Sequence, residues 1–153
     1  MKRMIKAHLA VVTFLAAAIP ALGFATSKDD AVALAQKAVA HVKEVGIDKA
    51  CKDFAVAGGE YFKGELYVFL QDKNSLMICH AAIPRTNGHN VSDIKDANGK
   101  FFAKEQTAMV MSKGSGWIDY VFANPVTHSM ENKSSYGLKI DGEHWLGVGV
   151  YRK

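Results

Sequence analysis

The stretch that decides the fold is Gly114–Tyr151, which reads GSGWIDYVFANPVTHSMENKSSYGLKIDGEHWLGVGVY. Runs rich in aromatic and β-branched residues alternate there with the turn formers Asn124-Pro125 and Asp141-Gly142. The pattern predicts three short strands joined by polar turns, over residues 116–122, 132–140 and 145–151.

These strands carry one cation and several aromatic side chains, namely Trp117, Tyr120, Lys133 and Tyr136. A small carboxylate ligand needs an ammonium group to balance its charge and hydroxyl donors among apolar rings. We therefore expect Lys133 to contact the carboxylate and the two tyrosines to donate hydrogen bonds. The alternatives are a solvent-facing lysine and ordinary sheet aromatics. Because side chains alternate along a strand, Trp117 and Tyr120 cannot both face one pocket unless a bulge intervenes.

The residues before this stretch predict helices and a hairpin. Ser27 and the acids after it open a helix whose apolar positions recur every 3.6 residues until Gly46 ends it. That face comprises Ala31, Leu34, Ala35, Ala38, Val39 and Val42. Further on, the sequence predicts a helical turn, two strands, a long polar segment and a second helix, over residues 48–54, 66–71, 76–81, 84–100 and 101–112.

The order of these elements predicts the fold class. Strands that come in runs, rather than alternating with helices, indicate an antiparallel sheet in an α+β domain. We expect five strands, with the long N-terminal helix packed on one face and the helix-containing insertion over the other.

The first 25 residues have the pattern of a secretory signal peptide. Lys2, Arg3 and Lys6 precede an apolar run over residues 7–18, and Gly23-Phe24-Ala25 offers a cleavage site with small residues. We expect residues 26–153 to form one periplasmic or secreted domain. The alternative is an uncleaved N-terminus that anchors the domain to the membrane.

Charge gives no support for nucleic-acid binding. The chain has 19 Lys and Arg against 15 Asp and Glu, a net charge of +4. Without Lys2, Arg3 and Lys6 the balance is 16 against 15, or +1, and no basic cluster remains.

Two cysteines, Cys51 and Cys79, occur in this chain. In an exported protein they favour a disulfide, which would contribute about 3.5 kcal/mol by loop-closure entropy. The alternative is two buried thiols that pack as small apolar side chains.

Four more residues are candidates for the pocket. Tyr67 and Phe69 share a face of the first hairpin strand and could form its floor, although core packing is the alternative. His80 ends the second strand and could meet a carboxylate in a pH-dependent manner. Arg85, in the polar segment, could close over the ligand; the alternatives for both are exposed surface positions.

Motifs for metal or catalysis are absent from the sequence. The six histidines are scattered, and no CxxC, HExxH or CxxCH occurs. Gly114-Ser115-Gly116 is not a nucleophile elbow, and Asp93, Asp96 and Asn98 lack the spacing of a calcium loop. We expect no cofactor, no metal and no enzymatic activity.

The chain resembles the single Cache domain, a sensor module of bacterial chemoreceptors and histidine kinases, in its small, exported, stand-alone variety. The matching segments are GELYVFLQDKNSLMICHA, DIKDANGKFFAKE, KGSGWIDYVFANPVT, KSSY and GVGVY, in this order from residue 64 to residue 151. The resemblance implies a PAS-like sheet, a ligand pocket under the insertion, and small ligands such as short carboxylates. Typical receptors continue past the last strand, whereas this chain ends at Lys153, and CHAAIPRTNGHNV (79–91) departs from the family pattern.

The sequence therefore predicts an exported sensor domain that binds a short carboxylate or similar metabolite. It would act in signal transduction, related to chemotaxis, through a separate membrane receptor or kinase. A homodimer through the N-terminal helix is a further expectation. The alternative is a structural or interaction module of the cell envelope with a filled core.

Overall fold

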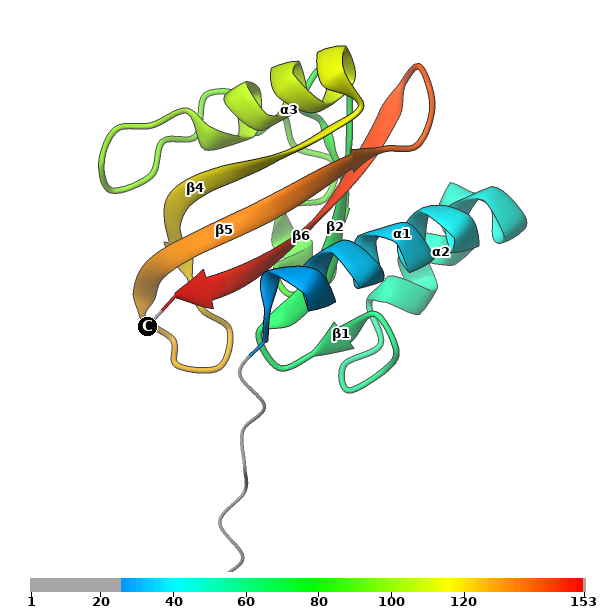
Figure 1. Cartoon of the computed structure of the whole chain (residues 1–153), viewed down its shortest axis with the longest axis horizontal. Helices are drawn as coiled ribbons and strands as arrows, with labels where there is room; N and C mark the ends of the chain where they lie inside the picture. Colours follow the sequence, from blue (N-terminus) through cyan, green and yellow to red (C-terminus); the bar gives the residue numbers. More distant parts are fainter. Residues whose placement is uncertain (1–25, 153) are drawn as a thin grey trace, which may run out of the picture.

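The computed structural model describes residues 26–152 (Figure 1). The signal-peptide prediction falls on residues 1–25 and lies outside this range. The elements are α1 (Lys28–Val45), α2 (Ile47–Phe54), β1 (Phe62–Lys63), β2 (Leu66–Asp72), β3 (Met77–His80), the 3-10 turn η1 (Pro84–Thr86), α3 (Phe102–Lys113), β4 (Ser115–Ala123), β5 (Met130–Lys139) and β6 (His144–Arg152).

The strands form one antiparallel sheet. Their order is β1-β2-β6-β5-β4, and β3 also pairs with β2. The predicted α+β class is confirmed, with one addition: β1 has only two residues, too few to show the period-2 pattern from which a strand is predicted.

Helix α1 covers one face of the sheet, against β5 and β6. It begins at a capping box, in which Ser27 Oγ accepts from the Asp30 amide at 3.1 Å and Asp30 accepts from the Ser27 amide at 2.8 Å. Its buried face comprises the six predicted residues, Ala31, Leu34, Ala35, Ala38, Val39 and Val42. Gly46, with φ of 82°, ends the helix where other residues would be strained.

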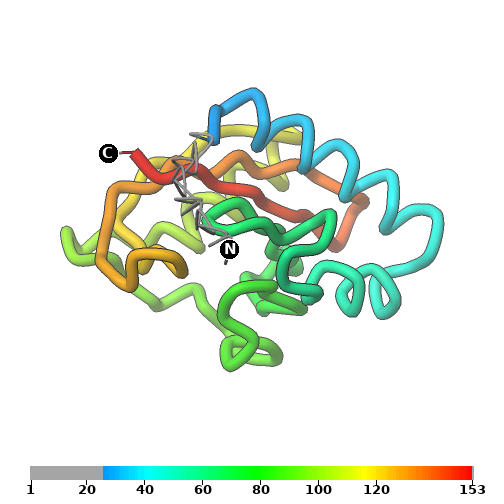
Figure 2. The backbone as a smooth tube through the Cα atoms, turned by 90° about the horizontal axis from the view of Figure 1, so that it is seen from below, coloured from blue at the N-terminus to red at the C-terminus, as the bar shows by residue number. Residues whose placement is uncertain are grey.

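Helix α3 and the segment 81–101 cover the other face, so the sheet separates two hydrophobic cores. Figures 1 and 2 show α1 and α3 on opposite sides of the strands. Asp96 holds the segment to the edge of the sheet, because its carboxylate accepts the amides of Asn98, Lys100 and Val121 at 2.9–3.0 Å.

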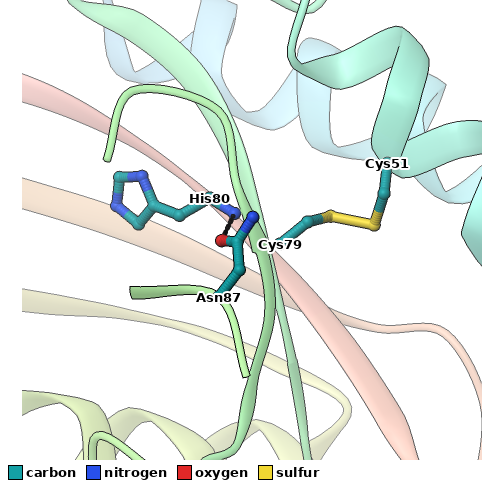
Figure 3. The surroundings of a disulfide bond; sticks show 4 residues. All are labelled: Cys51, Cys79, His80 and Asn87. Atoms are coloured by element: carbon teal, nitrogen blue, oxygen red, sulfur yellow. Dashed lines mark hydrogen bonds between the residues drawn. A yellow bond between two sulfur atoms is a disulfide. The ribbon is translucent and has the colours of Figure 1, made fainter. Parts of the chain in front are cut away.

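A disulfide joins α2 to β3. Cys51 and Cys79 are bonded, with their Cα atoms 5.8 Å apart. Of the two possibilities that the sequence left open, the disulfide is the one present. Figure 3 shows the Cys79 side chain pointing to α2 while the next side chain, His80, points to the opposite side of the strand. The disulfide therefore fixes the edge strand from one face and leaves His80 on the other.

Gly147 and Gly149 leave space on the face of β6 that lies toward α3. A Cβ atom at Gly147 would lie 2.3 Å from the Phe69 ring, and one at Gly149 would lie 2.2 Å from Lys133 Cε and 2.4 Å from Ser135 Oγ. Such distances are far inside van der Waals contact, so these glycines make room for the neighbouring side chains.

We predict that Gly149→Ala destabilises the protein by about 1–3 kcal/mol, because the added methyl group displaces the Lys133 stem in a packed core. Gly142→Ala is the matched control, since a Cβ atom there meets nothing within 4 Å. Urea unfolding of both variants measures the difference. Equal stabilities would contradict the packing described above.

Among residues 26–152, no helix combines the length and the apolar character needed to cross a membrane.

Candidate functional site

Lys133 is fully buried in the middle of β5, on the face toward α3. Its Nζ lies 4.1 Å from the centroid of the Tyr67 ring, 5.0 Å from that of Tyr151, 5.1 Å from that of Phe122 and 5.8 Å from that of Phe69. Within residues 26–152 it makes no ion pair with an acidic side chain. Among the described residues, the contacts that stabilise this ammonium group are aromatic faces and one hydroxyl group.

A directed chain of hydrogen bonds starts at this ammonium group. Lys133 Nζ donates to Tyr67 Oη at 2.7 Å, and Tyr151 Oη donates to the Ala123 carbonyl at 2.6 Å. The hydroxyl groups of Tyr67 and Tyr151 are 3.1 Å apart. Because the Tyr151 proton is already used, Tyr67 is the donor to Tyr151. Each hydroxyl is thus committed, and two N–H groups of Lys133 have no acceptor in the described part of the chain.

Burial shifts the pKa values in this group. Desolvation lowers the pKa of Lys133 from 10.5 to about 7. Desolvation also raises the pKa of Tyr67, Tyr120 and Tyr151, so the phenols stay neutral at physiological pH.

Tyr120 lies directly opposite Lys133 in the β4–β5 pairing. It is buried, its ring stacks on Phe102 with centroids 4.4 Å apart, and its hydroxyl hydrogen bonds to Ser135 Oγ at 2.9 Å. Both hydroxyls can rotate, so Tyr120 can redirect its proton to a ligand while Ser135 donates to it.

His80 is also buried, and it is neutral. Desolvation and the nearby Lys133 charge lower its pKa from 6.5 to about 3. Its Nδ1 accepts from the Ile83 amide at 3.0 Å, which places the proton on Nε2. The imidazole is therefore uncharged near neutral pH, and its pH-dependent contact with a carboxylate stays a prediction, whereas the alternative of an exposed histidine is wrong.

A cavity of about 60 Å³ lies between the sheet, α3 and the segment 81–101. Space of this size admits only a few water molecules or a very small ligand. Its wall is mostly aromatic and aliphatic, with a few polar side chains, and comprises Phe69, Gln71, Met77, His80, Thr86, Val91, Ile94, Phe102, Ala103, Gln106, Tyr120 and Phe122. Because Phe69 and Phe122 also contact Lys133 Nζ, the ammonium group sits directly behind this wall.

A wider groove of about 250 Å³ adjoins the cavity on the outside. Thr86, Ile94, Phe102 and Phe122 line both spaces. The groove also carries the two cations Arg85 and Lys95. Arg85 is exposed and lies at this outer rim, away from the buried cavity.

The sequence of this domain matches a known family. Residues 30–153 match the family described as Single Cache domain 2. The chain belongs to this family. Cache domains are extracytoplasmic sensor modules of receptors, and the antiparallel sheet with the N-terminal helix α1 on one face matches the fold of such domains.

Among curated proteins, this Cache domain is similar to the sensor histidine kinase MctS of Rhizobium johnstonii, with 31% identity over 86 residues. The match covers 56% of this chain but only 18% of that kinase, so it concerns a small part of the relative.

Solved structures show the same Cache fold. A methyl-accepting chemotaxis protein from Vibrio parahaemolyticus has a TM-score of 0.70 at 22% identity, over 81% of this chain and 87% of that one. A domain described under the words "structural basis for carboxylic acid recognition by a Cache chemosensory domain" has a TM-score of 0.69 at 26% identity, over 82% and 92%. A periplasmic sensor domain of a chemotaxis protein has a TM-score of 0.61 at 25% identity, over 82% and 90%.

The Cache domain brings five of the predicted pocket residues to the face toward α3: Tyr67, Phe69, His80, Tyr120 and Lys133. Two others are elsewhere. Trp117 and Tyr136 pack on each other, with ring centroids 5.3 Å apart, in the core on the α1 side. Their predicted place in the pocket is wrong, because each is separated from Lys133 or Tyr120 by an odd number of positions and therefore faces the opposite side of the sheet.

Sequence reasoning missed four residues of this region. Phe122 lies two positions after Tyr120 and Gln71 two positions after Phe69, so the alternation of side chains along a strand could have predicted both. Tyr151 is paired with Lys133 through β6, which only the strand register reveals. Gln106 is one of two polar residues, with Thr107, among the four buried positions of α3, and the sequence alone does not show that these positions are buried.

The Cache domain should gain stability as pH rises above 7, because the folded state loses the Lys133 proton near pH 7 while the unfolded state keeps it to about 10.5. Unfolding then takes up a proton, which higher pH disfavours. We predict that the stability of the wild type, relative to Lys133→Met, increases by about 2 kcal/mol from pH 6.5 to pH 9. Urea unfolding at several pH values measures this.

The comparison with Lys133→Met cancels the groups common to both proteins, including His80, whose pKa of about 3 affects stability only below its unfolded value of 6.5. Stability curves that run parallel from pH 6.5 to pH 9 would show that Lys133 titrates normally.

Proposed function

We propose that this chain is an exported, non-catalytic sensor domain that binds a short carboxylate beside Lys133. The observation that carries the proposal is the buried ammonium group, which has no acidic partner within residues 26–152 and two N–H groups to spare. Burying such a charge unpaired is costly, and an anionic ligand removes the cost.

The chemistry around Lys133 favours a carboxylate. Charge-assisted hydrogen bonds from an ammonium group to a carboxylate are short and strong. Tyr120 adds a neutral hydroxyl donor next to Lys133 in the sheet, and the aromatic rings exclude water. The small cavity restricts the ligand to a few carbon atoms. The Cache structure described for carboxylic acid recognition, at 26% identity, supports the same ligand class.

Entry of the ligand would depend on Phe122. This half-buried ring lines both the cavity and the outer groove and lies against Lys133 Nζ. Rotation of the ring would open the wall between groove and ammonium group. Arg85 and Lys95 at the groove would raise the local concentration of anions before they enter.

Output would pass through a kinase or a chemoreceptor, since the relatives are a sensor histidine kinase and a methyl-accepting chemotaxis protein. Dimerisation through α1 stays a prediction. The cavity of small-ligand size argues against the alternative, a structural module with a filled core.

We predict that short monocarboxylates raise the melting temperature of the oxidised protein, and that Lys133→Met weakens their binding by about tenfold to a hundredfold through loss of a charged hydrogen bond. Calorimetry gives the dissociation constants. Lys104→Met, at an exposed position of α3, is the matched control and should bind as the wild type does. If Lys133→Met binds the acids as tightly as the wild type does, the carboxylate does not bind at Lys133. If no acid raises the melting temperature or gives a binding signal, the proposal is refuted.

Binding should also depend on pH. The carboxylate binds the ammonium form of Lys133, whose pKa is about 7 in the free protein. We predict a constant affinity below pH 7 and a decline of up to about tenfold per pH unit above it, with proton uptake on binding. Titrations from pH 6 to pH 9, in buffers of different ionisation enthalpy, measure both quantities. A constant affinity without proton uptake would contradict this assignment.

A further inference from the structure

Two buried glutamines, Gln71 of β2 and Gln106 of α3, line the same cavity. Gln71 is 3% exposed and Gln106 is 1% exposed. Neither residue is needed for carboxylate binding as described above. Their amide groups are neutral hydrogen-bonding groups of the cavity wall.

Each glutamine uses one end of its amide inside the protein. Gln106 Nε2 donates to the Ser135 carbonyl at 3.1 Å, and Gln71 Oε1 accepts from Thr107 Oγ1 at 3.4 Å. Within residues 26–152, the other ends, Gln106 Oε1 and Gln71 Nε2, have no partner. Among the described residues, the cavity wall therefore offers one unused acceptor, Gln106 Oε1, and two unused donors, Gln71 Nε2 and the Nε2–H of His80.

These free amide ends keep contact with the cavity space. The one fully enclosed side-chain nitrogen or oxygen without a partner, among the described residues, is Trp145 Nε1. Gln106 Oε1 and Gln71 Nε2 are thus not sealed into packed protein. Because Gln71 and Gln106 are almost fully buried and both line the cavity, we take their remaining accessible surface to face the cavity.

Gln106 Oε1 needs a donor, which a hydroxyl group supplies while it also accepts from Gln71 Nε2. A keto group would leave Gln106 Oε1 unpaired, and a second carboxylate would bring negative charge against it. An alkyl group would leave both amide ends unpaired, at a cost in binding free energy.

We propose that the ligand is a hydroxy acid, with its carboxylate on Lys133 and its hydroxyl group between Gln106 Oε1 and Gln71 Nε2. This inference rests on the proposed function and adds the class of ligand.

The test is calorimetry of the oxidised protein with butyrate and with 2-, 3- and 4-hydroxybutyrate, which share one carbon skeleton. At least one of the three hydroxy acids should bind about tenfold more tightly than butyrate. Gln71→Met and Gln106→Met should lose the gain, measured in each variant as the ratio of its affinity for the hydroxy acid to its affinity for butyrate. Gln36→Met, at an exposed position of α1, is the matched control and should retain it.

The outcomes separate this inference from the proposed function. If butyrate binds but no hydroxyl group improves affinity, or if the gain persists in both cavity variants, the hydroxy-acid assignment is overturned and the carboxylate site stands. If neither butyrate nor any hydroxy acid binds, both are overturned. The wild-type series alone decides the first question, so a variant that fails to fold does not block the test.

Discussion

The fold is organised around a buried ammonium ion that has no carboxylate beside it in the described chain. Water is removed from Lys133 on every side, and what replaces it is weak by comparison: four aromatic faces and one phenol oxygen. The ammonium group stays buried because the packing around it prevents the lysine side chain from reaching solvent. Gly149 supplies the hollow for the lysine stem, and the Tyr67–Tyr151 hydrogen bond fixes the acceptor. An anion beside Lys133, as proposed, would offset the cost of burying this charge.

Much of this arrangement could be predicted from periodicity. The buried face of α1 was predicted residue by residue, because its apolar positions follow the helical period. The alternation rule also separated Trp117 from Tyr120. Applied with the same strictness, it would have excluded Tyr136, which is three positions from Lys133 and so lies on the α1 side of β5.

The burial of Lys133 could not be predicted in this way. Alternation gives two faces but does not say which one a helix covers, and a lysine on a half-polar strand is equally compatible with solvent. Burial follows from the packing of α3 and segment 81–101 over the sheet, which are contacts between distant parts of the chain. The role of Tyr151 depends on the β5–β6 register, and that of Gln106 depends on which face of α3 packs on the sheet. Neither can be predicted from the local sequence.

The disulfide has a consequence for the cavity as well as for the fold. His80, one of the cavity residues, follows Cys79 directly on a four-residue edge strand, and the covalent link to α2 fixes where that strand runs. Reduction would release the strand from α2 and, with it, one wall of the space that a ligand would occupy. The redox state of the two cysteines therefore affects ligand binding. Protein made in a reducing compartment would lack the disulfide, and this wall of the cavity would be less firmly held. Weak binding by such protein would result from the missing disulfide and would not be a property of the native domain.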